Sequence, residues 1–246
     1  RAAERAPNSV SNARLTLAGT LLLAGGAEFG GQMMAPDREA IERAGGLAAP
    51  IRIIPAAAAP DHNHQRAGRN GENWFRSLSA RDVAVVPVID RASAEDERLA
   101  SELRRARLIY LLGGFTQYLG QTIAGSACAH AMGAAYEAGA VLAGSSAGAM
   151  VLCEHYYDPS EERVHRGLGY LANACLLPHY STFGQRWVTR LVALLPSVSL
   201  VGIDEETGMM VDEADGRRWR VYGRGQVTLH RRGHTHAFPE GAMFTL

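Results

Sequence analysis

Short apolar runs recur along the first 150 residues, and amphipathic segments separate them. The runs are continuously apolar, which is typical of strands buried on both faces rather than strands with one face in water. They are Thr20–Ala24, Ile51–Pro55, Val83–Val88, Leu108–Leu112 and Val141–Ala143. Alternation of such runs with helical segments predicts an α/β fold, a mostly parallel sheet covered by helices on both faces.

The intervening segments carry helix signals. The predicted helices are Pro36–Ala44, Asn73–Leu78, Ser93–Ala106 and Thr116–Ala138, the last with a break at Gly125. Ser93 is expected to cap the third of these, because three acidic residues follow it and arginines fill the last turn. A polar loop is expected between Pro60 and Gly71.

The pattern weakens after residue 155. We expect a charged loop over Asp158–Arg166, strands at Ala174–Leu177 and Leu200–Ile203, and a helix at Trp187–Leu195. Antiparallel strands are expected at Met209–Val211, Trp219–Tyr222 and Gln226–Leu229, joined by turns at Asp215-Gly216 and Gly223–Gly225. We expect residues 1–17 to be a flexible extension and residues 18–246 to form a single hydrolytic domain.

Composition narrows the classes of partner. Arginine and lysine number 25, aspartate and glutamate number 25, and the sequence pI is about 7.3. We therefore expect neither nucleic acid nor a membrane as partner, and the apolar run Leu21–Ala24 is too short to span a bilayer. The three cysteines are too few for a disulfide framework, which favours a reducing, cytoplasmic setting.

The strand at Val141 runs into Gly144-Ser145-Ser146-Ala147-Gly148, a G-x-S-x-G motif of the kind that forms a nucleophile elbow, a tight turn from a strand into a helix. A tight strand-to-helix turn leaves no room for side chains on either side of the serine, which glycine satisfies. The following helix directs free N–H groups toward a developing oxyanion. The motif predicts that Ser146 is a nucleophile, although a plain turn would have the same composition.

A serine nucleophile needs a base, an acid and oxyanion donors. Gly113-Gly114 ends the strand expected beside the elbow, so its N–H groups could act with that of Ala147 as the oxyanion hole. His179 follows a short strand at the same sheet edge, and Asp204-Glu205-Glu206 follows another. Two His-x-His pairs, His62/His64 and His234/His236, could each hold a metal. Neither has a supporting carboxylate or cysteine cluster, so we expect no metal and no cofactor.

Together, several motifs resemble the dipeptidase E and cyanophycinase family of serine peptidases. They are Leu111–Thr116, Gly144–Ala149, Gly167–Leu171, Pro178–Tyr180 and Val201–Thr207. The resemblance implies a class I glutamine amidotransferase-like, flavodoxin-like fold, with an antiparallel C-terminal segment here. It also implies the roles of nucleophile for Ser146, base for His179 and acid for Glu205. The neighbouring Asp204 and Glu206 stay open as the acid.

The implied activity is hydrolysis of short or unusual peptides through an acyl-enzyme. Gly113, Phe115, Thr116 and Arg186 are candidate substrate contacts, although Phe115 stands where members of the family commonly have Asn or Asp. A small peptide is the expected partner, and a homodimer stays open.

Two alternatives compete with this interpretation. One is an α/β-hydrolase esterase, whose triad order would require a base at His230, His234 or His236. The other is a catalytically silent amidotransferase-like domain that binds a small ligand or a partner.

Overall fold

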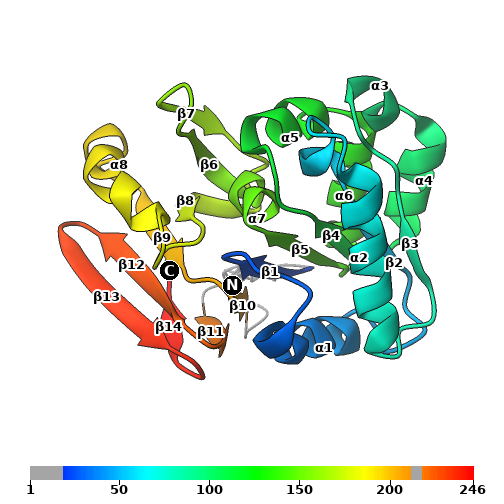
Figure 1. Ribbon diagram of the computed structural model, residues 1–246, viewed down its shortest axis with the longest axis horizontal. Helices are drawn as coiled ribbons and strands as arrows, with labels where there is room; N and C mark the ends of the chain where they lie inside the picture. Colours follow the sequence, from blue (N-terminus) through cyan, green and yellow to red (C-terminus); the bar gives the residue numbers. More distant parts are fainter. Residues whose placement is uncertain (1–18, 212–217) are drawn as a thin grey trace, which may run out of the picture.

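The computed structural model describes residues 19–211 and 218–246, and the strands of this part form two sheets (Figure 1). The expected N-terminal extension and the Asp215-Gly216 turn lie outside the described residues. The first sheet has the order β14-β11-β10-β1-β5-β4-β2-β3. Its strands are β1 (Thr20–Ala24), β2 (Ile51–Ile54), β3 (Val83–Val85), β4 (Leu108–Leu111), β5 (Val141–Ser145), β10 (Thr207–Val211), β11 (Arg218–Gly223) and β14 (Met243–Thr245). The first five of these are parallel, as predicted, and the other three are antiparallel.

A second sheet, which the sequence did not predict as separate, has the order β13-β12-β9-β8-β6-β7. Its strands are β6 (Cys153–Asp158), β7 (Arg163–Arg166), β8 (Leu171–Leu177), β9 (Ser199–Ile203), β12 (Gln226–Arg231) and β13 (His234–Pro239). The turn at Gly223–Gly225 therefore does not join a hairpin, because it carries the chain from one sheet to the other.

Helices cover both faces of the first sheet. The helices are α1 (Met34–Arg43), α2 (His64–Ser77), α3 (Arg91–Ala94), α4 (Glu97–Arg105), α5 (Thr116–Ile123), α6 (Ala127–Glu137), α7 (Ala147–Leu152) and α8 (Val188–Leu194), with 3-10 turns at Gly31–Met33, Ala56–Ala58 and Gly184–Trp187. Ile41 of α1 and Phe75 of α2 are buried in one core, and α4 to α7 pack in the core on the opposite face. Helix α7 contacts strands of both sheets (Figure 1). In the described part of the chain, we find no helix with the length and apolarity that crossing a bilayer requires.

Three local predictions were wrong for identifiable reasons. The expected polar loop is helical from His64 onward. Gly68 and Gly71 weaken the helix signal in the sequence, which is why the helix was not predicted there. In the structure their lack of side chains lets α2 lie close to Val85 and Ile53. The helix expected from Ser93 is two helices, since Asp90 caps α3 and Asp96 caps α4.

The expected charged loop at Asp158–Arg166 is instead the β6–β7 hairpin, in which Asp158 lies opposite Arg163. Its strands are short, and polar side chains hide the alternation that a strand normally shows.

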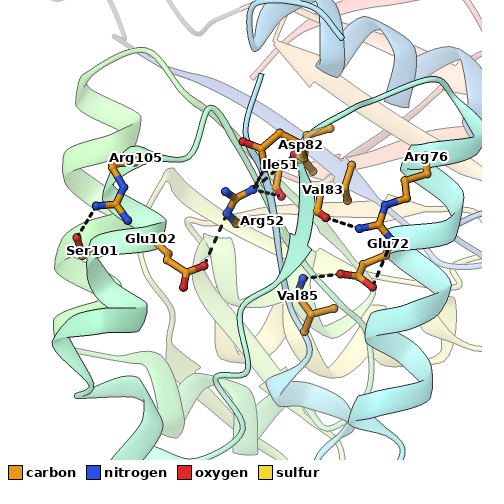
Figure 2. A network of polar contacts seen from close by, with 10 residues as sticks. All are labelled: Ile51, Arg52, Glu72, Arg76, Asp82, Val83, Val85, Ser101, Glu102 and Arg105. Carbon is orange, nitrogen blue, oxygen red and sulfur yellow. Dashed lines mark hydrogen bonds and ion pairs between the residues drawn. The ribbon is translucent and has the colours of Figure 1, made fainter. Parts of the chain in front are cut away.

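Strand β3 is an edge of the first sheet, and side chains of α2 satisfy its outer backbone groups (Figure 2). The N–H of Val85 donates to Oε1 of Glu72 at 3.1 Å, and Arg76 donates to the carbonyl of Val83 at 2.8 Å. An edge strand with occupied hydrogen-bonding groups cannot recruit another strand. Arg52 ties the neighbouring strand to Asp82 at 2.8 Å.

A carboxyl group is buried between α1 and α2. Asp37 is fully buried, and its Oδ2 accepts a hydrogen bond from the indole Nε1 of Trp74 at 2.7 Å. Burial raises the pKa of Asp37 from its usual 3.8 to about 7; the Trp74 hydrogen bond opposes this rise, and the negative charge of Glu28 adds to it.

This buried acid predicts that unfolding free energy falls as pH rises from about 4 to about 7. The folded protein binds the proton of Asp37 more tightly than the unfolded chain does. Between about pH 4 and about pH 7 the unfolded chain has lost this proton while the folded protein keeps it, so a rise in pH favours the unfolded chain. Above about pH 7 Asp37 is ionised in both states, and the folded state bears the cost of the buried charge. The full effect is on the order of 4 kcal/mol. Asp37→Asn should abolish this part of the pH dependence in urea unfolding at a series of pH values. Parallel stability–pH curves for the two proteins would contradict the assignment.

Candidate active site

Three consecutive backbone carbonyls at the end of β1 accept hydrogen bonds from the three segments that form the candidate site. The carbonyl of Ala24 accepts from the N–H of Ser146 at 3.0 Å. The carbonyl of Gly25 accepts from the N–H of His179 at 2.8 Å, and that of Gly26 from the N–H of Glu206 at 3.0 Å. The ends of β5, β8 and β9 therefore meet at one point, although β5 belongs to one sheet and β8 and β9 to the other.

Ser146 lies at the predicted turn between β5 and α7. Its φ is 50°, a left-handed conformation that costs a non-glycine residue on the order of 1–3 kcal/mol. The flanking glycines are required by space, because a Cβ at Gly144 would lie 2.5 Å from Gly148 and one at Gly148 would lie 2.1 Å from the carbonyl of Leu111. The packing thus forces the serine side chain out of the turn.

His179 lies between Ser146 and Glu205. Its Nε2 is 3.0 Å from Oγ of Ser146, and its Nδ1 is 2.8 Å from Oε1 of Glu205. A Cβ at Gly26 would lie 2.2 Å from the imidazole, so only glycine leaves room for the ring. The ring of Phe183 stacks on the imidazole with centroids 5.0 Å apart.

The contacts of the three neighbouring acids differ. The Oδ2 of Asp204, a buried residue, accepts from the N–H of Gln226 at 3.0 Å. Glu206 pairs with Arg224 at 3.5 Å. Glu205 alone of the three contacts the imidazole, and it stays 44% exposed.

Backbone donors lie beside the serine. Gly113 and Gly114 follow β4, and a Cβ at Gly113 would lie 3.3 Å from the Cβ of Ser146. The first hydrogen bond of α7 runs from the N–H of Met150 to the carbonyl of Ser146, which leaves the N–H of Ala147 outside the helical hydrogen bonds.

A cleft of about 590 Å³ opens next to Gly113 and Gly114. Its polar lining consists of carboxylates, amides and a serine: Glu28, Asp61, Asn63, Asn70, Asn73 and Ser77. Glu28 joins the cleft to the elbow, since its Oε2 accepts from Oγ of the buried Ser145 at 2.8 Å. Sequence reasoning missed Glu28, Asp61 and Phe183; for Glu28, the available signal was its position just after the Gly25-Gly26 turn.

The other predicted substrate contacts lie outside the lining of this cleft. Phe115 is 52% exposed, and its N–H donates to the carbonyl of Ala57 at 2.8 Å. The hydroxyl of Thr116 contacts Sδ of Met150 at 3.5 Å. Arg186 is exposed on the 3-10 turn that follows His179.

The histidines that the esterase alternative requires lie elsewhere. His230 contacts the hydroxyl of Tyr180 at 2.7 Å and that of Thr235 at 2.9 Å, and burial lowers its pKa. His234 and His236 stack on each other on exposed β13, with centroids 6.3 Å apart.

Solved structures share the fold. A peptidase from an acI-B1 actinobacterium aligns with a TM-score of 0.81 and 26% identity, over 93% of this chain and 97% of that one. A putative peptidase E from Listeria monocytogenes EGD-e, at 17% identity, aligns with a TM-score of 0.56 over 87% of this chain and 98% of that one. The second similarity concerns the fold alone.

Curated relatives carry the name cyanophycinase. The protein of Synechococcus elongatus is 35% identical over 205 residues, which are 76% of this chain and 60% of that protein. The protein of Geminocystis herdmanii (strain PCC 6308) is 27% identical over 230 residues, which are 87% of this chain and 80% of that protein. The chain thus spans about three fifths of the length of the first relative. The family model for peptidase family S51 matches residues 21–218. This match covers most of the sequence and includes every element that meets at the end of β1, so the chain belongs to peptidase family S51.

Proposed function

We propose that the protein is a serine peptidase of the cyanophycinase and dipeptidase E type, which cleaves peptides through an acyl-enzyme. The observation that carries the proposal is the hydrogen-bonded series of Ser146, His179 and Glu205 at the end of β1. A hydroxyl 3.0 Å from an imidazole whose other nitrogen faces a carboxylate is the arrangement that makes serine nucleophilic.

The proposed reaction has two halves. Oγ of Ser146 attacks the scissile carbonyl while Nε2 of His179 takes its proton, and the imidazolium then gives that proton to the leaving amine. Water repeats the sequence on the acyl-enzyme and releases the acid. Glu205 holds the imidazole by Nδ1 and stabilises its positive charge.

The N–H groups of Gly114 and Ala147 are the proposed oxyanion donors. Both belong to the backbone, and neither needs to reorganise when negative charge develops on the substrate oxygen. No metal or cofactor takes part in the proposed steps, because the base, the acid and the donors are all protein groups.

The cleft beside the elbow supports a substrate with a cationic group. Glu28 and Asp61 are carboxylates on its wall, and the described lining contains no arginine. We therefore place the positively charged part of a short peptide in this cleft, with Gly113 and Gly114 as its floor. Phe115, Thr116 and Arg186 remain predicted contacts for substrate parts outside the cleft.

Two further expectations gain support. The nucleophile comes from one sheet and the base and acid from the other, which supports a single hydrolytic domain over residues 18–246.

The three cysteines are buried free thiols, which supports a cytoplasmic setting.

Removal of the nucleophile or the base should abolish hydrolysis. Ser146→Ala and His179→Ala should each lower kcat by at least about 10⁴-fold, because triad residues act as a unit. Ser145→Ala, His234→Ala and His236→Ala are the controls and should keep most of the activity. Kinetics on one good dipeptide substrate measure this; an active His179→Ala, or an inactive Ser145→Ala with an active Ser146→Ala, would refute the assignment.

Removal of the acid should cost less. Glu205→Gln should retain roughly 10²-fold more activity than Ser146→Ala, because backbone contacts and Phe183 still position the imidazole. The matched control is Glu206→Gln, which loses only the Arg224 pair and should behave like the wild type. If the two variants exchange these results, Glu206 is the acid.

The acidic cleft predicts a preference for positive charge. A peptide with arginine should have a higher kcat/KM than the same peptide with citrulline, which keeps the shape and lacks the charge. Asp61→Asn should reduce this ratio at least about threefold, while Glu97→Gln, an exposed carboxylate on α4, should not. A ratio near one in the wild type would exclude a cationic subsite in the cleft.

A further inference from the structure

Three potential metal ligands converge at the turn of the β6–β7 hairpin. Asp158 ends β6, His165 lies in β7, and Glu161 lies in the turn between them. Each offers one ligand atom within 4.8 Å of the other two. No hydrogen bond or ion pair among the described residues joins this group to Ser146, His179 or Glu205, so it is separate from the proposed active site.

Two of the three side chains have a buried polar atom without a partner. Asp158 is only 6% exposed, and its Oδ1 accepts from the N–H and hydroxyl of Ser160 at 2.8 and 2.7 Å. Its Oδ2 and the Nε2 of His165 are both buried and have no hydrogen-bond partner in the described part of the chain. A buried polar atom without a partner costs about 1–3 kcal/mol, so such atoms normally indicate a missing ligand or water.

The charges of the group are also uncompensated by arginine. Among the described residues neither Asp158 nor Glu161 pairs with an arginine, although Arg163 lies opposite Asp158 in the hairpin. The imidazole of His165 stacks on the ring of Tyr156 with centroids 5.3 Å apart, which fixes its orientation.

The ligand set and one distance fit zinc. Two carboxylates and an imidazole are ligands that zinc accepts, with bonds of about 2.0–2.2 Å. Tetrahedral geometry at that bond length separates neighbouring ligand atoms by about 3.3–3.6 Å. The Nε2 of His165 is 3.5 Å from Oε2 of Glu161, too far for a good hydrogen bond but suited to two ligands of one ion.

We propose that Asp158, Glu161 and His165 bind one zinc ion that fastens the β6–β7 hairpin. The ion would take the buried Oδ2 of Asp158 and the Nε2 of His165 as ligands and offset both negative charges. Strand β7 is an edge of the second sheet, and β6 pairs with β8, which leads to His179. Metal binding would therefore stabilise the part of the second sheet that supports the proposed base. The inference does not depend on the proposed function.

Zinc titration of the EDTA-dialysed full chain tests the site, with binding stoichiometry measured by calorimetry and Tm by thermal unfolding. We expect one zinc ion to bind and Tm to rise by about 5 °C or more near saturation. Asp158→Asn, Glu161→Gln and His165→Ala should lose this response. Glu161 is 44% exposed, so its variant tests the site even if the buried Asp158 variant fails to fold.

Two controls separate this site from other zinc ligands. Glu162→Gln changes the adjacent carboxylate, which pairs with Arg190 and not with His165, and it should bind zinc as the wild type does. His236→Ala breaks the exposed histidine pair of β13 and should also keep the response. The proposal is wrong if zinc leaves the wild-type Tm unchanged, if Glu161→Gln and His165→Ala respond fully, or if His236→Ala removes the response.

Discussion

The backbone hydrogen bonds at the end of β1 are the constraint on which the site depends. Three successive carbonyls, from Ala24 to Gly26, each hold the N–H of a different segment, and those segments carry the serine, the imidazole and the acids. Strand β1 lies between β5 and β10 in the sheet, so packing on both sides fixes these carbonyls. The relative positions of Ser146, His179 and Glu205 therefore depend on main-chain hydrogen bonds, and the side chain of the partly exposed Glu205 does not have to determine them.

This arrangement has a conformational cost that the fold offsets elsewhere. Ser146, His179 and Glu206, the three residues whose N–H groups those carbonyls hold, all have positive φ near 50°. Each such residue costs about 1–3 kcal/mol, and it persists only because the surroundings fix it. The short strands β1, β5 and β9, which are buried except at Thr20, supply that rigidity. Gly26 has no side chain to collide with the imidazole.

The hydrophobic pattern was informative where burial is complete. It predicted the five parallel strands, the break at Gly125 and the elbow, because buried strands and glycine turns leave local signals. It failed at α2 and at the β6–β7 hairpin. There the decisive facts are contacts that the hydrophobic pattern does not encode: the packing of Gly68 on Val85, and the backbone register that places Asp158 opposite Arg163 across the hairpin.

The candidate site, like the fold, was predicted from the sequence only in part. Its three central residues could be proposed because each follows an apolar run, and the family resemblance pointed to Glu205 among three adjacent acids. The sequence analysis placed all three at the edge of one sheet, whereas β5 lies in the first sheet and β8 and β9 lie in the second. Asp61 could not be found, because its approach to Gly113 depends on how the segment before α2 lies over the sheet. For Glu28 the only signal in the sequence was its position just after the Gly25-Gly26 turn. The role of Gly26 also requires the fold, since His179 is distant in sequence and only the assembled sheets bring its ring against this glycine.

Covalent labelling tests the central claim most directly, because it requires no knowledge of the substrate. A fluorophosphonate reacts only with a serine whose hydroxyl is activated and exposed beside oxyanion donors. Tryptic mass spectrometry of the labelled wild-type protein should find one adduct, on Ser146, and that adduct should be absent from His179→Ala. Absence of labelling in the folded wild type, or an adduct on Ser145 instead, would contradict the account.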